Sequence, residues 1–166
     1  MNQLRARAGF TLLEVLVTVV ILSLGMLGVA GVLLLVHKNN ASSYMEQQAV
    51  QQAYDIVDRM RANRSAALNG DYTTNPPPTS KPTPDCSAAT CTPTQMAKYD
   101  LWQWNSDLQA NLPAASATVS KFTPAGVSSS NQDVGVQVRI SWSDAPAQQA
   151  LKQKVAKATY TLQTVL

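Results

Sequence analysis

The feature that most constrains this chain is one long apolar segment near its N-terminus. Residues 10–36 contain a single charged side chain, Glu14. A helix over this stretch would be about 40 Å long at ~1.5 Å per residue, which exceeds a hydrocarbon core of ~30 Å. No second segment approaches the ~20 apolar residues that a span requires, so the sequence argues against a multi-span membrane protein. We therefore predict one membrane-spanning helix followed by a more polar region rich in Thr, Ala, Gln and Ser.

The charges before this segment predict its orientation. Arg5 and Arg7 precede the apolar run without an acidic neighbour, which favours a cytoplasmic N-terminus with the rest of the chain across the membrane. A secretory signal peptide cleaved near residues 29–31 is the alternative, but its apolar region would normally be ~7–15 residues long. Without the first nine residues, 11 basic side chains face 10 acidic ones. This balance gives little support to nucleic-acid binding, which needs a sustained basic face.

Glu14 is the anomaly of the apolar segment. A carboxylate costs ~2.5–3.5 kcal/mol at the centre of a bilayer, so it either needs a partner or lies at headgroup depth and reaches water. Residues 5–16, with the sequence RARAGFTLLEVL, resemble the leader and mature start of type IV pilins and type II secretion pseudopilins. The resemblance implies cleavage by prepilin peptidase between Gly9 and Phe10, and N-methylation of Phe10. Glu14 would then be the fifth residue of the mature chain, where the family has its glutamate.

This processing would keep the membrane anchor and create a new cation at the Phe10 amine, whose charge methylation preserves. In a packed helix bundle, Glu14 of one subunit would pair with the Phe10 amine of a neighbour and set the axial register. Gly25, Gly28 and Gly31 recur at every third residue. They suit close helix packing or local helix melting, although glycine is also generally enriched in membrane helices.

Beyond the membrane segment, the pattern predicts a longer helix and then a second one. Apolar residues at helical spacing over residues 42–64 indicate an amphipathic continuation of the first helix, which Gly70 and the prolines at 76–78 would stop. Residues 69–93 form a predicted proline-rich loop. A second helix is expected over 94–112, with Thr94 as N-cap and Pro113 after its end. Trp102 and Trp104 on this helix favour core packing over an exposed contact patch.

The C-terminal part predicts an antiparallel sheet. Apolar and polar residues alternate over 134–142 and 157–165, and a shorter strand is expected near 117–122. Such strands laid on the amphipathic helix give an α+β class, and this arrangement resembles the pilin fold. The predicted organisation is a cleaved leader at 1–9, a transmembrane and filament-core helix at 10–36, and a periplasmic head at 37–166 with its strands between 116 and 165.

Two cysteines, Cys86 and Cys91, lie close together in the predicted loop. In an oxidising periplasm their spacing indicates a local disulfide, with free thiols as the alternative. A zinc site is disfavoured because two thiols need further ligands and His37, the only histidine, is predicted near the membrane exit. We therefore expect no metal and no cofactor.

The sequence contains no phosphate-binding loop, dinucleotide fingerprint, metal-binding His pair or serine-nucleophile elbow. Asp100 and Asp107 are seven residues apart and can share one helix face, but paired carboxylates need raised pKa values to act in catalysis. We therefore expect no catalytic residues and no enzymatic activity.

Residues 14–17, 58–63 and 94–104 further resemble the minor pilins of type IV pili. That resemblance implies a low-abundance subunit that primes assembly with other minor pilins and the major pilin, and lies near the fibre tip. It implies contact with prepilin peptidase and the assembly platform of the bacterial inner membrane, before transfer to the pilus at the cell surface. Two alternatives remain: a secretion pseudopilin of an initiating complex, and a tip module for adhesion or DNA binding that uses Lys152, Lys154 and Lys157.

Overall fold

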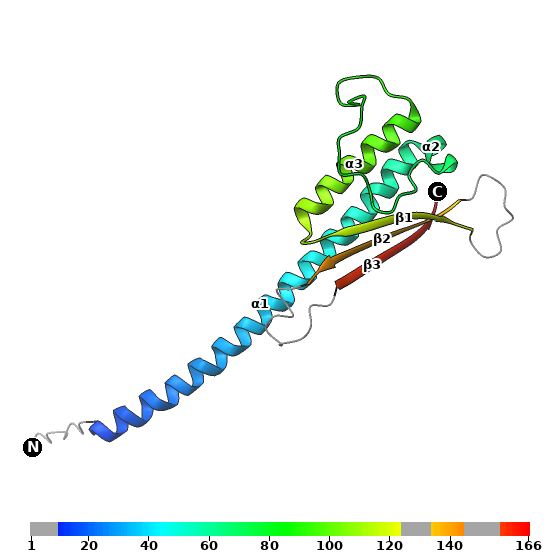
Figure 1. Ribbon diagram of the computed structural model, residues 1–166. Coiled ribbons are helices and arrows are strands. Elements are labelled where there is room, and N and C mark those ends of the chain that lie inside the picture. Colours follow the sequence, from blue (N-terminus) through cyan, green and yellow to red (C-terminus); the bar gives the residue numbers. More distant parts are fainter. Residues whose placement is uncertain (1–9, 124–133, 145–156) are drawn as a thin grey trace, which may run out of the picture. The chain divides into compact units, whose positions relative to one another are not determined.

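The computed structural model describes residues 10–123, 134–144 and 157–166, without the side chains of residues 38 and 39. The chain divides into two compact units, one up to Asn40 and one from Ala41 to Leu166. Along the chain the elements are α1 (Leu12–Ala62), α2 (Arg64–Asn69), α3 (Pro93–Asn111), β1 (Ser116–Phe122), β2 (Gly135–Ser143) and β3 (Lys157–Val165) (Figure 1). A long apolar helix followed by a small antiparallel sheet confirms the predicted α+β pilin fold.

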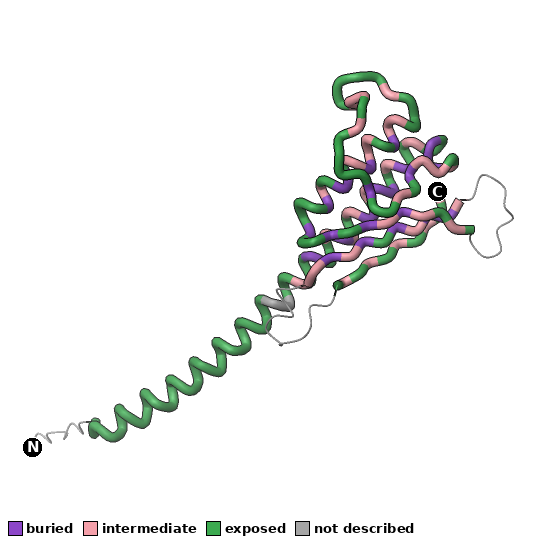
Figure 2. Tube along the Cα trace, in the orientation of Figure 1, coloured by how far each residue is buried: buried purple, intermediate pink, exposed green. Residues whose placement is uncertain are grey.

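In the first unit, α1 is apolar and exposed on all sides. Every described side chain from residue 10 to residue 37 is exposed (Figure 2). α1 is long and apolar enough to cross a membrane. Because water solvates such a surface poorly, lipid or other apolar helices are its expected neighbours.

α1 ends earlier than predicted. The sequence pattern continues to about Arg64, but α1 stops at Ala62 and α2 follows after Asn63, whose backbone is not helical. The Asn63 side-chain amide donates to the Pro93 carbonyl over 2.7 Å, which fixes this junction against the start of α3. Gly70 does end a helix, as predicted, but that helix is α2; Gly70 takes the left-handed conformation with φ 92° that glycine adopts without strain.

α3 begins one residue before the prediction, and its cap is Thr92 rather than Thr94. The Thr92 hydroxyl accepts from the Gln95 backbone N–H at 3.3 Å, while the Gln95 side chain accepts from the Thr92 N–H at 2.9 Å. This reciprocal capping box leaves Pro93 at the first helical position, where a missing N–H costs nothing. Thr94 instead donates its hydroxyl to Asp71.

The sheet has the order β1-β2-β3, and both pairs are antiparallel. Val119 lies opposite Val138, which in turn lies opposite Leu162. The alternation predicted for the central strand is confirmed from Val136 onward, because Val136, Val138, Ile140 and Trp142 are buried and the residues between them from Gln137 to Ser141 are not. At the start of the predicted pattern, Gly135 is buried and Val134 is only half-buried. One side of the sheet therefore belongs to the core and the other faces outward.

The core of the second unit joins this sheet to the apolar faces of the helices (Figure 2). From α1 it takes Met45, Ala49, Ala53, Ile56, Val57 and Met60. Trp104 of α3 is fully buried, and its indole N–H donates to the Gln52 carbonyl of α1 over 2.8 Å. The core prediction is thus confirmed for Trp104, whereas Trp102 is only half-buried, beside Tyr99 at 5.4 Å between ring centroids.

We expect Trp104→Phe to lower the free energy of unfolding by about 1–2 kcal/mol, because it removes the indole hydrogen bond and leaves a smaller ring in a closed site. Denaturant unfolding of the detergent-solubilised chain, followed by circular dichroism, measures this loss. Trp102→Phe is the matched control on the same helix and should change the unfolding free energy by less than about 0.5 kcal/mol. Equal losses in the two variants would contradict the assignment of Trp104 as the helix–helix anchor.

Candidate functional site

The start of α1 holds the residues that the sequence singles out for assembly. Thr11 directly precedes the helix, and its hydroxyl accepts from the backbone N–H of Glu14 at 3.3 Å, as an N-cap does. Glu14 lies in the first turn, where a carboxylate favours the positive end of the helix dipole. The Thr-x-x-Glu spacing of Thr11 and Glu14 is a capping signal in the sequence, and the structure shows the half of it that Thr11 makes.

Phe10 and Glu14 are both exposed in the isolated chain. The side chain of Phe10 is 83% exposed, and Glu14 is exposed one turn further along. Gly9, the other residue of the predicted cleavage site, lies outside the described residues, as do Arg5 and Arg7. What the structure describes is a carboxylate that a neighbouring molecule can reach, close to the expected new N-terminus.

The three glycines of the apolar segment are not required by packing within the chain. A methyl group added at Gly25, Gly28 or Gly31 would meet no atom within 4 Å. A hollow of ≈ 590 Å³ lies along this surface, lined by Ile21, Leu22, Gly25, Met26, Val29, Ala30 and Leu33. Because small residues let helices approach closely in an apolar medium, this stretch suits contact with another helix.

In the head, Arg59 gathers three aspartates. Its guanidinium lies 3.0 Å from Asp55, 3.7 Å from Asp100 and 3.9 Å from Asp107. It also donates to the Gln103 side-chain oxygen over 3.0 Å. The prediction that Asp100 and Asp107 share a helix face is therefore confirmed, and both carboxylates meet the same cation of α1.

The electrostatics of this cluster indicate a structural role. Burial raises the pKa of Asp100, while the hydrogen bond from the Tyr72 hydroxyl and the Arg59 charge act in the opposite direction. Burial and the contact with Asp100 raise the pKa of Tyr72. Tyr72 donates to Asp100 and receives a hydrogen bond from Asn63. Asp100 is thus surrounded by groups of the chain itself, and the cluster connects α1, α3 and the segment after α2.

The loop before α3 contains the predicted disulfide between Cys86 and Cys91. Lys81 forms an ion pair with Asp85 in the same loop, and its ammonium lies 5.5 Å from the centre of the Trp102 ring. Hydrogen bonds from Lys81 and Ser87 lower the pKa of Asp85 to about 2. The disulfide, the ion pair and the aromatic contact together tie the loop to itself and to α3.

Loss of this disulfide should leave a head that still folds. A ring with a sequence separation of 5 removes little entropy from the unfolded chain, so we expect Cys86→Ser together with Cys91→Ser to lower the free energy of unfolding by no more than ~2–3 kcal/mol. Denaturant unfolding of the oxidised chain, the reduced chain and the double variant measures this. A head that fails to fold without the disulfide would contradict the prediction.

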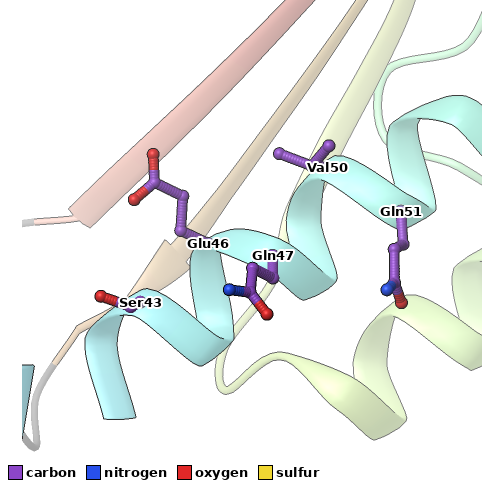
Figure 3. A pocket seen from close by; sticks show the side chains of 5 residues that line it. All are labelled: Ser43, Glu46, Gln47, Val50 and Gln51. Carbon is purple, nitrogen blue, oxygen red and sulfur yellow. The ribbon is translucent and has the colours of Figure 1, made fainter. Parts of the chain in front are cut away.

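The other polar features of the described residues lie on separate elements. Figure 3 shows a hollow along α1 lined by Ser43, Glu46, Gln47, Val50 and Gln51, which come from one face of a single helix. No group of three or more His, Cys, Asp or Glu side chains that could hold a metal occurs in the part of the chain that the structure describes. His37 is exposed on α1. Of the lysines considered for DNA binding, only Lys157 lies in the described residues, at the start of β3.

Comparison with known families supports the resemblance found in the sequence. A model of the prokaryotic N-terminal methylation motif matches residues 4–30. A family model described as type IV pilin Tt1218 matches residues 38–102. Together the two matched segments cover more than half of the chain. No curated protein and no solved structure matched it.

Proposed function

Starting from a chain that has the methylation motif, the matched head segment and the fold of a type IV pilin, we propose that it is a minor pilin that helps to prime pilus assembly. In this role it enters the fibre at or near the tip and acts by helix packing and subunit contacts. The observation that carries the proposal is the first unit of the structure, an apolar helix exposed on all sides with one carboxylate in its first turn. This surface has no partner within the described chain, so its partners must come from outside.

The proposed processing follows from the same segment. Prepilin peptidase would remove residues 1–9 by cutting between Gly9 and Phe10, and the new amine of Phe10 would be N-methylated. Glu14 would pair with the Phe10 amine of a neighbouring subunit and fix the axial position of one helix against the next. The exposure of Phe10 and Glu14 in the described part of the chain supports this pairing, because a neighbouring subunit can reach both.

The proposed location changes during assembly. The precursor would sit in the bacterial inner membrane with its N-terminus in the cytoplasm and residues 37–166 in the periplasm, where the assembly platform extracts it. The disulfide between Cys86 and Cys91 supports a periplasmic head, since disulfides persist in oxidising compartments. The other minor pilins and the major pilin would be its partners in the fibre.

A minor role is favoured over that of the major subunit. The resemblance of residues 58–63 and 94–104 is to the minor pilin PilV, and the cysteines lie in a middle loop between α2 and α3. The secretion pseudopilin is disfavoured because the related initiating subunit is typically shorter and lacks such a loop. The part of this loop that contains the cysteines contacts itself and α3, through the Lys81–Asp85 ion pair, the Lys81–Trp102 contact and the hydrogen bond from Asn105 to the Pro78 carbonyl.

Quantification of sheared fibres tests the minor-pilin proposal. We expect the chain to be present in purified pili far below one copy per major subunit, and its deletion to reduce the number of fibres without changing the amount of major pilin in the membrane. Restoring the chain should restore the fibres. Normal fibre numbers after deletion, or a chain as abundant as the major subunit, would overturn the proposal.

A further inference from the structure

The outward side of the sheet, called here the outer sheet face, is polar across its central part. Its central part consists of the residues that alternate with the core positions: Ser116, Thr118 and Ser120 of β1, Gln137, Arg139 and Ser141 of β2, and Thr159, Thr161 and Gln163 of β3. Eight of these nine side chains are neutral hydroxyls or amides. The same register places Phe122, Gly135 and Val165 at one end of this face, and Ser143 and Lys157 at the other. The three strands contain no Asp or Glu.

Arg139 is the one charge in the middle of this face. It lies on the central strand, directly opposite Thr118 on one side and Thr161 on the other. Among the described residues it has neither an ion pair nor a side-chain hydrogen bond, and its side chain is exposed. Arg59 and Arg61 of α1, in contrast, are each paired with aspartates. The guanidinium of Arg139 thus offers its fork of five N–H donors to an external group.

The surface around Arg139 is hollowed and has a fixed rim. Two neighbouring hollows share Asn75, Thr118 and Arg139 in their linings, and the larger one measures ≈ 480 Å³. This rim is the segment at residues 73–76, which lines the hollows beside β1. Two backbone hydrogen bonds between Thr74 and Val119, each 3.0 Å long, hold it against the strand. The Thr74 hydroxyl also donates to the Pro76 carbonyl over 2.8 Å. Because the rim is tied to the sheet, little ordering is needed when a ligand enters.

We infer that the outer sheet face binds an acidic saccharide, whose carboxylate pairs with Arg139 and whose hydroxyls meet the surrounding polar side chains. A planar guanidinium binds a carboxylate through two parallel hydrogen bonds. The amides of Asn75 and Gln137 and the hydroxyl of Thr118 both donate and accept, as sugar hydroxyls do.

The number of charges favours a saccharide over a nucleic acid. Nucleic-acid binding draws most of its affinity from several phosphate contacts made by Lys and Arg. The centre of this face offers one guanidinium. Lys157, the first residue of β3, lies at one end of the face, away from Arg139. A single carboxylate per sugar unit matches a single cation. The inference goes beyond the assembly role and does not depend on it, because the site lies wholly within the head.

Binding of an acidic oligosaccharide to the full-length chain in detergent micelles tests the inference. Calorimetric titration would compare tetragalacturonate with maltotetraose, a neutral oligosaccharide of the same length. We expect saturable binding of tetragalacturonate and none of maltotetraose. Arg139→Gln should weaken tetragalacturonate binding at least about tenfold, as the loss of a charge-assisted contact predicts. Lys98→Gln removes an exposed cation from α3 and should leave the affinity unchanged.

Several results would overturn the inference. One is the absence of saturable binding up to about 10 mM tetragalacturonate. The others are equal affinities for tetragalacturonate and maltotetraose, and equal affinities of the Arg139→Gln and native chains for tetragalacturonate. Tighter binding of a DNA duplex of about 20 base pairs, with a steep salt dependence, would replace the saccharide by a nucleic acid. Arg139→Lys keeps the charge and the fold but loses the planar fork, so it should bind with intermediate affinity; an unchanged affinity for this variant would also count against the inference.

Discussion

Replacing Glu14 with alanine is expected to leave the protein in the membrane and to remove it from the assembled fibre. If Glu14 pairs with the amine of a neighbouring Phe10 in an apolar bundle, its loss leaves that cation buried and unpaired. Breaking a buried pair in this way typically costs ~3–5 kcal/mol, which lowers incorporation by a factor of about 100 or more. Comparison of the membrane fraction with sheared fibres measures the two quantities separately.

Membrane insertion should survive this change for a physical reason. Removing a carboxylate makes residues 10–36 more apolar, so transfer into the bilayer becomes easier, by up to ~2.5–3.5 kcal/mol near the centre. The N-cap remains, because the hydroxyl of Thr11 accepts from the backbone N–H of residue 14 and not from its side chain. Glu46→Ala is the matched control, since Glu46 is an exposed carboxylate further along α1. Normal incorporation of the Glu14→Ala chain, or equal loss in the control, would contradict the pairing.

Replacing Arg59 with methionine is expected to destabilise the head by about 2–4 kcal/mol at neutral pH. Methionine keeps much of the apolar stem but leaves three aspartates without their shared cation. The penalty is concentrated at Asp100, whose side chain is only 13% exposed, because an unpaired carboxylate is poorly solvated there. Denaturant unfolding of the full-length chain in detergent, followed by tryptophan fluorescence, measures the change.

Arg61→Met is the matched control for this experiment. Arg61 lies two residues away on the same helix and pairs with Asp58, but both partners are largely exposed, with 48% and 68% of their side-chain surfaces accessible. Exposed pairs contribute little, so this variant should stay within about 0.5 kcal/mol of the native chain. A similar loss in both variants would contradict a special role for the Arg59 cluster.

The pH dependence of the Arg59→Met chain gives a second, independent readout. Burial raises the pKa of Asp100 in the folded head above its ordinary value of 3.8. The stability that protonation of this group adds is therefore fully present below that ordinary value, and it is lost as the pH rises through the folded pKa. Without Arg59, which lowers the pKa of Asp100, the folded pKa rises further. The difference in unfolding free energy between the native chain and the Arg59→Met chain should accordingly shrink as the pH falls from neutral towards 4. A difference that grows would contradict the account.

Local periodicity predicts most of the fold, because the side chains in the middle of each strand alternate between a more buried and a more exposed side. The alternation around Val138 and Ile140 is enough to identify the central strand, and β1 and β3 follow from shorter versions of the same pattern. The break at Asn63 has no such signal, since neither proline nor glycine marks it. Its hydrogen bond to Pro93, 30 residues away, fixes it through tertiary structure instead.

The candidate site residues likewise divide into those that the local sequence predicts and those that only the tertiary structure brings together. Glu14 and Phe10 follow from a local motif, and Asp100 and Asp107 from a helical repeat of seven. The cation that joins those aspartates, Arg59, lies on another helix, so sequence spacing provides no means of pairing them. Arg139 is likewise visible in the sequence only as a polar residue in an alternating strand. Its isolation among neutral neighbours emerges when three strands and the segment at 73–76 are brought side by side.

The intact mass and the N-terminal residue of the membrane-extracted protein test the central claim most directly. A pilin precursor cut between Gly9 and Phe10 must start at Phe10, and its mass must include the added methyl group. We predict this result in cells that contain prepilin peptidase and an uncut chain in cells that lack it. A chain that starts near Gly31, or one that keeps Met1 in the presence of the peptidase, would contradict the account and leave a secreted or simply anchored domain.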